Sequence, residues 1–178
     1  FHTLQHQISV VFICLLLLSI FTITLINGLF LEKYYVSKKV EVLEEAKEVL
    51  SQMNLDDILQ YDTDIEEDKK GATDEISDEI ERSSSRNNLT WIIVNEENSG
   101  YYYWGENNMA KMLRSKLFGY VNDLDKDMER SRILKQTDTC TMWQVHDRFA
   151  GMEYVECWGQ FDNGYYFLIR SPLESIKE

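Results

Sequence analysis

The sequence predicts an α+β protein in which an N-terminal transmembrane helix continues into a long helix, followed by a domain with a five-stranded antiparallel sheet. Three observations support this prediction. An uncharged apolar segment lies near the N-terminus, helical periodicity follows it directly, and short β-branched and aromatic segments separated by turn sequences fill the C-terminal half. The part outside the apolar segment is long enough for one domain with a hydrophobic core.

The apolar segment covers residues 8–31 (ISVVFICLLLLSIFTITLINGLFL) and contains no charged residue. At ~1.5 Å rise per residue, a helix of this length extends ~36 Å, enough to cross a ~30 Å hydrocarbon core with some tilt. A cleavable signal peptide would have a shorter apolar core followed by a small-x-small cleavage site, and no A-x-A pattern follows here. A buried core helix is disfavoured because the segment has no polar face. We therefore predict a transmembrane helix.

A second helical pattern follows at residues 34–53. Its apolar residues recur at spacings of three and four, at Val36, Val40, Leu43, Ala46, Leu50 and Met53. No Gly or Pro lies between Leu29 and Gly71, so we expect the membrane helix to continue into the soluble domain without a break. An unbroken helix is what mechanical coupling across a membrane requires.

An acid-rich stretch separates this helix from the next one. A loop is expected around residues 61–71, and Thr73 is the predicted N-cap of a helix that ends near residues 84–88. The spacing of Asp62, Asp64 and Glu66 is loosely similar to the start of a calcium loop, but the sixth-position Gly and the distal Glu of that loop are missing. A solvated loop is favoured over a cation site, and no metal site is predicted.

Strand and turn patterns then alternate to the end of the chain. We expect a hairpin, a helix and three further strands, in the order 89–95, 101–104, 107–120, 133–146, 152–160 and 165–170. The D-N-G sequence at residues 162–164 joins the last two strands. Ser171 and Pro172 are the expected N-cap and first residue of a final helix.

Two segments carry a resemblance to a known family. LEKYYVSKK (31–39) and FDNGYYFLIRSPLESIKE (161–178) resemble the corresponding segments of clostridial-type sensor histidine kinases. The order of elements resembles the PAS-like, single-Cache fold of extracellular sensor domains. The resemblance covers the layout of the whole chain but is close only in these two segments. It implies a sensor domain at 32–171 and, at 172–178, the start of a helix leading to a second transmembrane span that this chain lacks.

The resemblance also implies an orientation and a role. Residues 1–7 would be a cytoplasmic stub, and residues 32–178 would lie outside a bacterial cell membrane. Taken alone, the positive-inside rule predicts the opposite, because Lys33, Lys38 and Lys39 follow the span and the stub contains no Lys or Arg. The implied role is signal sensing by a homodimer in a two-component system. The response regulator would be reached through a histidine kinase core that is absent here. The alternatives are the sensor of a chemoreceptor or cyclic-dinucleotide enzyme, and a membrane-anchored binding protein.

Composition and motifs limit the chemistry. With 31 Asp and Glu against 18 Lys and Arg, the formal net charge is −13, which argues against a nucleic-acid partner because phosphates require a basic surface. No nucleophile elbow, Walker loop or zinc-protease motif occurs, so neither a catalytic residue nor a cofactor is predicted for this segment. The expected ligand is an unidentified small molecule, cation or peptide.

By analogy with Cache-like domains, a small-molecule pocket would use the concave face of the sheet and the helix after the second strand. The residues expected there are aromatic or basic, namely Trp91, Tyr101, Tyr103, Arg114, Trp143 and Arg148. Trp104, Asp138, Tyr154 and Trp158 are further candidates. Aromatic rings with a polar handle suit a pocket, and they suit a hydrophobic core equally well.

Two cysteines follow in the predicted strands. If residues 147–150 form the hairpin loop, Cys140 and Cys157 face each other directly, with Cβ atoms ~4.5–5.5 Å apart. That pairing permits an extracellular disulfide, and two free thiols packed side by side are the alternative. Cys14 lies in the membrane segment.

Overall fold

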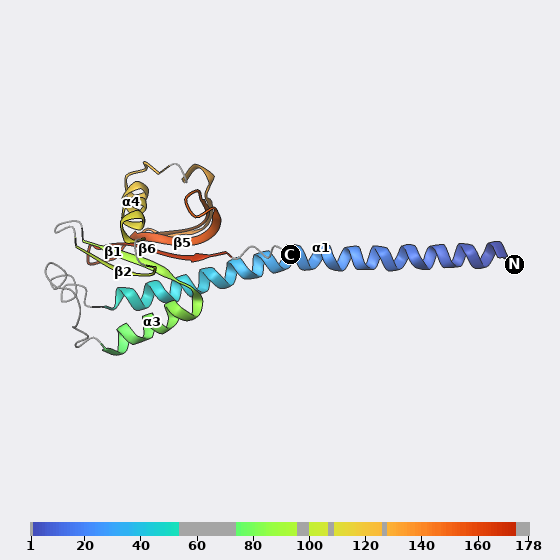
Figure 1. The fold of residues 1–178 in the computed structure, drawn as a ribbon, viewed down its shortest axis with the longest axis horizontal. Helices are drawn as coiled ribbons and strands as arrows, with labels where there is room; N and C mark the ends of the chain where they lie inside the picture. The colour runs from blue at the N-terminus through green and yellow to red at the C-terminus, as the bar shows by residue number, and fades with distance from the viewer. Residues whose placement is uncertain (1, 54–73, 96–99, 107–108, 126–127, 174–178) are drawn as a thin grey trace. The chain divides into compact units, whose positions relative to one another are not determined.

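The computed structural model describes residues 2–53, 74–95, 100–106, 109–125 and 128–173. It confirms the α+β class. The chain divides into two compact units, Phe1–Lys38 and Lys39–Glu178. The elements in chain order are α1 (His2–Ser51), α3 (Asp74–Asn87), β1 (Thr90–Val94), β2 (Tyr101–Trp104), α4 (Ala110–Val121), η1 (Met128–Arg130), β3 (Arg132–Gln136), β4 (Cys140–Asp147), β5 (Met152–Gln160) and β6 (Tyr166–Pro172) (Figure 1).

The first unit consists of the N-terminal part of α1. This part contains a segment long and apolar enough to cross a membrane, and none of that segment is buried by the rest of the chain. Large apolar side chains such as Phe12 and Phe21 are 62% and 65% exposed. The hydroxyls of Thr22 and Thr24 donate to backbone carbonyls one turn earlier in the helix, so their polar atoms are satisfied within it. These features suit a lipid environment.

The helix predicted at residues 34–53 is confirmed, because α1 continues to Ser51. In the second unit, Leu43, Ala46 and Leu50 of α1 are 0%, 1% and 0% exposed. They lie on one side of the helix and pack against the sheet in a cluster that also contains Ile80 of α3. The three-and-four spacing therefore identified the face of α1 that is buried.

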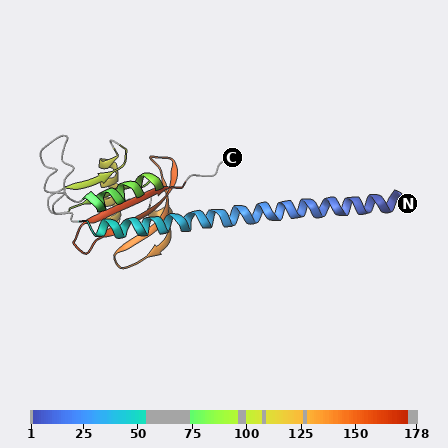
Figure 2. The ribbon, with the colours of Figure 1, turned by 90° about the horizontal axis from the view of Figure 1, so that it is seen from below.

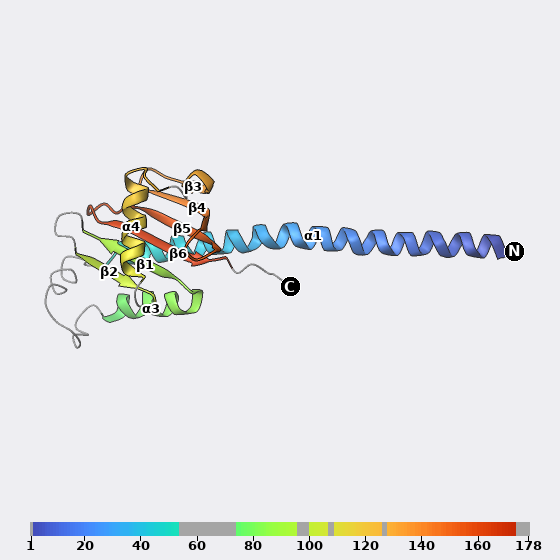
Figure 3. The ribbon, with the colours of Figure 1, turned by 45° about the horizontal axis from the view of Figure 1, so that its top comes forward.

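The sheet has six antiparallel strands in the order β2-β1-β6-β5-β4-β3, so the prediction of five strands is wrong (Figure 3). The segment expected to hold one strand contains both β3 and β4, which pair through a short turn. In this turn the amide of Thr137 donates to the Cys140 carbonyl at 2.9 Å, and the amide of Cys140 donates to the Thr137 hydroxyl at 3.2 Å. A threonine-based turn contains neither Gly nor Pro, which explains why the sequence pattern missed it.

Helices cover both faces of the sheet. The C-terminal part of α1 and helix α3 lie on one face, and α4 lies on the other (Figures 1 and 2). The side chains of β1 alternate accordingly: Trp91 and Ile93 pack toward α1, and Ile92 and Val94 pack toward α4. A strand buried on both sides reads as a continuous apolar run, as β1 does.

Two details of the strands differ from the predictions. Asp147 pairs with Met152, so the β4–β5 loop is 148–151 and not 147–150. Gly151 closes this loop with a φ of +67°. The shift places Cys140 opposite Gly159, so the predicted direct opposition of the two cysteines is wrong.

The end of the described chain also differs. Ser171 and Pro172 belong to β6, where they pair with Val155 and Tyr154, so neither begins a helix. Lys39 of α1 donates to the Ser171 hydroxyl at 2.7 Å, and that hydroxyl donates to the carbonyl of Asn87 at 3.1 Å. The hydroxyl that was expected to cap a helix instead ties β6 to α1 and α3. Residues 174–178 lie outside the described residues.

Candidate functional site: a buried charge cluster beneath helix α4

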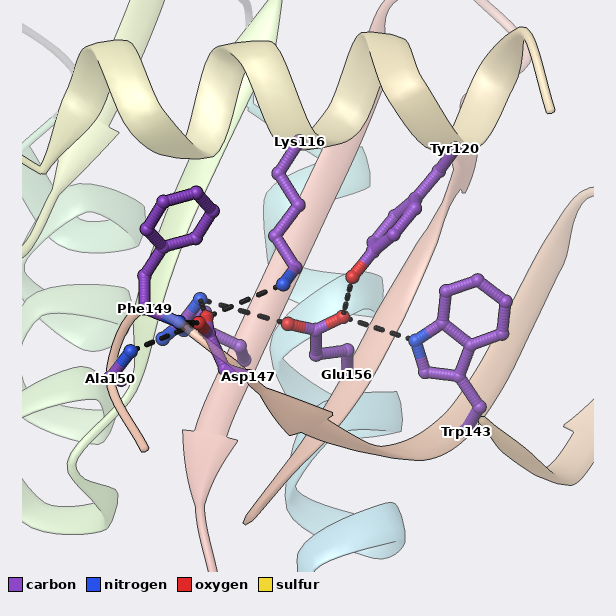
Figure 4. Close-up of polar contacts among 8 residues, drawn as sticks. Lys116, Tyr120, Trp143, Asp147, Phe149, Ala150 and Glu156 are labelled. Atoms are coloured by element: carbon purple, nitrogen blue, oxygen red, sulfur yellow. Dashed lines mark hydrogen bonds and ion pairs between the residues drawn. The ribbon is translucent and has the colours of Figure 1, made fainter. Parts of the chain in front are cut away.

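Four charged side chains, three of them labelled in Figure 4, are buried between α4 and the face of the sheet that it covers. Lys116, Asp147, Glu156 and Arg170 are 7%, 0%, 0% and 1% exposed. Burying a charge is costly unless it is paired and hydrogen-bonded. We refer to these four residues as the charge cluster.

Asp147 is the best-satisfied member of the charge cluster. Its Oδ2 accepts from Arg170 Nη1 at 2.8 Å and from Lys116 Nζ at 3.3 Å. Its Oδ1 accepts from the backbone amides of Phe149 and Ala150, at 2.9 and 3.1 Å, in the turn that follows β4. Burial alone would raise the pKa of Asp147, but the Ala150 amide and the two cations outweigh it and lower the pKa. Asp147 is thus an ionised counterion to both cations.

Glu156 lies at the centre of the charge cluster, opposite Arg170 on β6 and opposite Trp143 on β4. Its Oε2 accepts from the Tyr120 hydroxyl at 2.7 Å and from Trp143 Nε1 at 3.0 Å. Its Oε1 lies 3.7 Å from Arg170 Nη1 and has no hydrogen-bond partner within the described part of the chain. Burial raises the pKa of Glu156 despite the neighbouring cations. The two carboxyl groups therefore differ in charge state over part of the acidic pH range.

Arg170 connects the charge cluster to an open cavity. Its guanidinium carbon lies 3.6 Å from the centroid of the Tyr154 ring, a close cation–π contact. Burial lowers the pKa of Arg170, but Glu156, Tyr154 and Asp147 together raise it, so the side chain is charged. Its Nη2 has no hydrogen-bond partner among the residues described. A buried guanidinium with an unused donor is suited to bind a carboxylate or another anionic group.

The cavity beside Arg170 has a volume of about 890 Å³. It lies between the end of α3, the β1–β2 hairpin, the start of α4 and the β4–β5 loop, and its lining includes Tyr103, Trp104, Met109 and Tyr154. This is the size range of small-molecule sites, and the lining combines aromatic rings with one buried cation.

Three of the predicted pocket residues, Tyr103, Trp104 and Tyr154, line the cavity beside Arg170, and the others lie elsewhere. Trp143 belongs to the network of Glu156, and Tyr103 lines the cavity, where its hydroxyl donates to the Glu106 carbonyl at 2.8 Å. Trp91 lies on the opposite face, is 1% exposed and donates to the Ser84 hydroxyl at 3.0 Å. Trp91 therefore belongs to the core beneath α1.

Three charged residues that were also predicted do not line this cavity. Arg114 extends over the rings of Tyr101 and Phe118, 6.0 and 5.8 Å from their centroids. Arg148 is exposed in the β4–β5 loop, and Asp138 is exposed in the turn between β3 and β4. Neither Arg114 nor Arg148 lines the cavity beside Arg170.

The charge cluster itself was missed, although the sequence contains a signal for it. Arg170 follows Leu168 in the same alternating frame of β6, and Asp147 follows Val145 in β4. Lys116 lies three residues after Leu113, within the apolar stripe of α4. Charged residues at positions that the pattern assigns to the interior indicate a buried network.

The metal and disulfide predictions have different outcomes. Asp62, Asp64 and Glu66 lie outside the described residues. Within the residues that are described, no group of three or more His, Cys, Asp or Glu is placed to hold a metal ion. Cys140 and Cys157 are free thiols in this structure.

Comparison of the chain with protein-family models, with curated proteins and with solved structures finds no match. Any functional conclusion therefore depends on the geometry of the charge cluster, its cavity and helix α1.

Proposed function

We propose that this chain is the membrane-anchored sensing segment of a two-component sensor histidine kinase, with residues 32–178 outside the cell. The observation that supports this most is that one helix, α1, contains both a segment able to cross a membrane and residues of the sheet domain's core. A change in the packing of that core therefore acts directly on the helix that enters the membrane.

Strand β6 offers a route from the cavity to α1. Consecutive side chains of a strand point to opposite faces, so Arg170 enters the charge cluster while Ser171 meets Lys39 of α1. A ligand that moves Arg170 would shift the backbone of β6 and, with it, the bond between Ser171 and Lys39. A coupling free energy of ~1–3 kcal/mol is enough to change the output several-fold.

The ligand that fits best is a small molecule with a carboxylate or similar anionic group. Arg170 supplies the charge and an unused donor, and Tyr103 and Trp104 supply aromatic walls. The overall charge of −13 would slow the approach of an anion, so recognition has to come from local contacts.

Thermal unfolding of the full chain in detergent, against a panel of amino acids and small carboxylates, tests this proposal. A ligand at a hundred times its Kd should stabilise the domain by ~2.7 kcal/mol, a shift of several degrees. Arg170→Lys keeps the charge and loses the planar fork, so it should abolish the shift. Arg114→Lys makes the same change away from the cavity and should preserve it. The binding proposal is wrong if no compound stabilises the chain, or if both variants respond equally.

The output module is tested separately. The coding sequence beyond Glu178 should contain a second apolar segment and then a kinase core with its phospho-acceptor histidine. A chemotaxis or cyclic-dinucleotide module there would contradict the kinase assignment and leave the sensing proposal intact. The absence of a second span would favour an anchored binding protein.

A further inference from the structure

The face of the sheet beneath α1 holds two cysteines close together. Cys140 on β4 and Cys157 on β5 are 6% and 0% exposed, and they are diagonal neighbours in the antiparallel ladder. Directly opposite Cys140 is Gly159, where an added Cβ would clash with the Thr139 carbonyl oxygen. The required glycine leaves no side chain across from Cys140, so its thiol is free to interact with the thiol of Cys157.

The surroundings of Cys140 favour a thiolate. Lys47 of α1 places its Nζ 3.6 Å from Cys140 Sγ, and the Thr137 hydroxyl lies 3.2 Å from the same sulfur. The hydrogen bond from Cys157, followed by the contacts of Thr137 and Lys47, lowers the pKa of Cys140 against the opposing effect of burial. The same thiol–thiol contact and burial raise the pKa of Cys157. The contacts of Lys47 and Thr137 therefore favour the thiolate on Cys140 over the thiolate on Cys157.

Cys140 lies beside a cavity of about 550 Å³ at the end of the sheet, which it lines together with Thr137, Thr139 and Gly159. Two buried cysteines that served only as apolar packing would have no use for a lysine ammonium directed at one of them. A paired thiol, a nearby cation and an adjacent cavity are instead the features of a reactive dithiol.

We propose that Cys140 and Cys157 form a redox-active dithiol that hydroperoxides oxidise to a disulfide between β4 and β5. The Cys140 thiolate attacks a peroxide oxygen and breaks the O–O bond, which gives a sulfenic acid while the other oxygen leaves, protonated, as water or an alcohol. The Cys157 sulfur then attacks the sulfenic sulfur, the S–S bond forms, and hydroxide leaves with the Cys157 proton as water. Two electrons pass from the two sulfurs to the peroxide.

Oxidation would act on α1 directly. Lys47 follows the buried Ala46 in that helix, and its partner is the Cys140 thiolate. Forming the disulfide removes the negative charge of the Cys140 thiolate, so the Lys47 ammonium loses this anionic contact. This redox input is separate from the charge cluster, which lies on the other face of the sheet.

The test uses the full chain in detergent with Cys14→Ser, so that the membrane thiol does not react. The reduced chain is treated with hydrogen peroxide, unfolded, alkylated and mapped by mass spectrometry without reductant. We expect loss of both free thiols and a peptide cross-linked through Cys140 and Cys157. Cys157→Ser should stop at the sulfenic acid, which dimedone captures, and Cys140→Ser should not react.

Two lysine variants test whether the oxidation rate depends on the thiolate form of Cys140 or only on the accessibility of the cysteine. Lys47→Gln should raise the pKa of Cys140 and slow oxidation several-fold at mildly acidic pH, whereas Lys111→Gln, which removes an exposed lysine of α4 on the other face of the sheet, should leave the rate unchanged. The proposal is overturned if both thiols remain alkylatable after peroxide, if Cys140→Ser oxidises as fast as the parent chain, or if the two lysine variants behave alike.

Discussion

Removing the negative charge of Asp147 should destabilise the domain more than any substitution on the outside of the same hairpin. Asp147 is fully buried and is hydrogen-bonded to both Lys116 and Arg170. Asp147→Asn keeps the size of the side chain but leaves two buried cations with Glu156 as their only carboxylate in the charge cluster. Breaking a buried pair in this way costs ~3–5 kcal/mol. For a unit of roughly 140 residues, this corresponds to a fall in Tm of ~10–17 °C.

The assay is thermal or urea unfolding of the full chain in detergent, with Glu153→Gln as the matched control. Glu153 is on the same hairpin and pairs with His146 at 3.2 Å, but both side chains are close to half exposed, so this change should cost less than ~1 kcal/mol. Adding Lys116→Met to Asp147→Asn should restore part of the loss, because it removes one of the two buried cations that Asp147 neutralises. A loss below ~1 kcal/mol for Asp147→Asn, or no recovery in the double variant, would refute this account of the charge cluster.

Two further predictions concern pH and the link to α1. The folded-state pKa of Glu156 is raised above the ordinary 4.5, so its stabilising contribution is complete below that value and is lost as the pH rises through the folded pKa. The side chain in Glu156→Gln does not titrate. The free energy of unfolding of this variant, measured by chemical unfolding, should therefore improve relative to that of the parent chain as the pH rises. A difference between the two that does not depend on pH would contradict this. Ser171→Ala removes the bonds to Lys39 and Asn87 and should cost ~1 kcal/mol. Hydrogen exchange in residues 39–51 should rise in this variant, and unchanged exchange would argue against the link.

The helices and most strands could be predicted because their signals are local. The three-and-four spacing of Leu43, Ala46 and Leu50 identified the buried face of α1, and the alternation and turn residues around β1 and β2 identified the first hairpin. The turn between β3 and β4 was missed because Thr137 builds it with its hydroxyl. The β4–β5 register was predicted wrongly because the loop ends at Gly151. The left-handed backbone of Gly151 closes the loop at residues 148–151, and this decides which residues of β4 and β5 pair.

The candidate site was harder to predict because it depends on contacts between distant segments. Trp143 was predicted to line a ligand pocket, but it donates to Glu156. That pair and the ion pair of Asp147 and Arg170 require the register of three strands. Charged residues were assigned to the surface, where most of them lie. In this protein, the positions of charged residues within buried strands indicate the site better than the aromatic residues do.

The most direct test of the central claim is the side of the membrane on which the sheet domain lies. Phe149 in the β4–β5 loop is 85% exposed, and Thr3 lies in the predicted cytoplasmic stub. In a chain whose native cysteines are replaced by Ser, a membrane-impermeant maleimide is applied to intact cells and to lysed cells. If the sheet domain is extracellular, Phe149→Cys is labelled in intact cells, whereas Thr3→Cys is labelled only after lysis. The reverse result would place the domain in the cytoplasm, as the lysines after the span suggest, and would contradict an extracellular sensor.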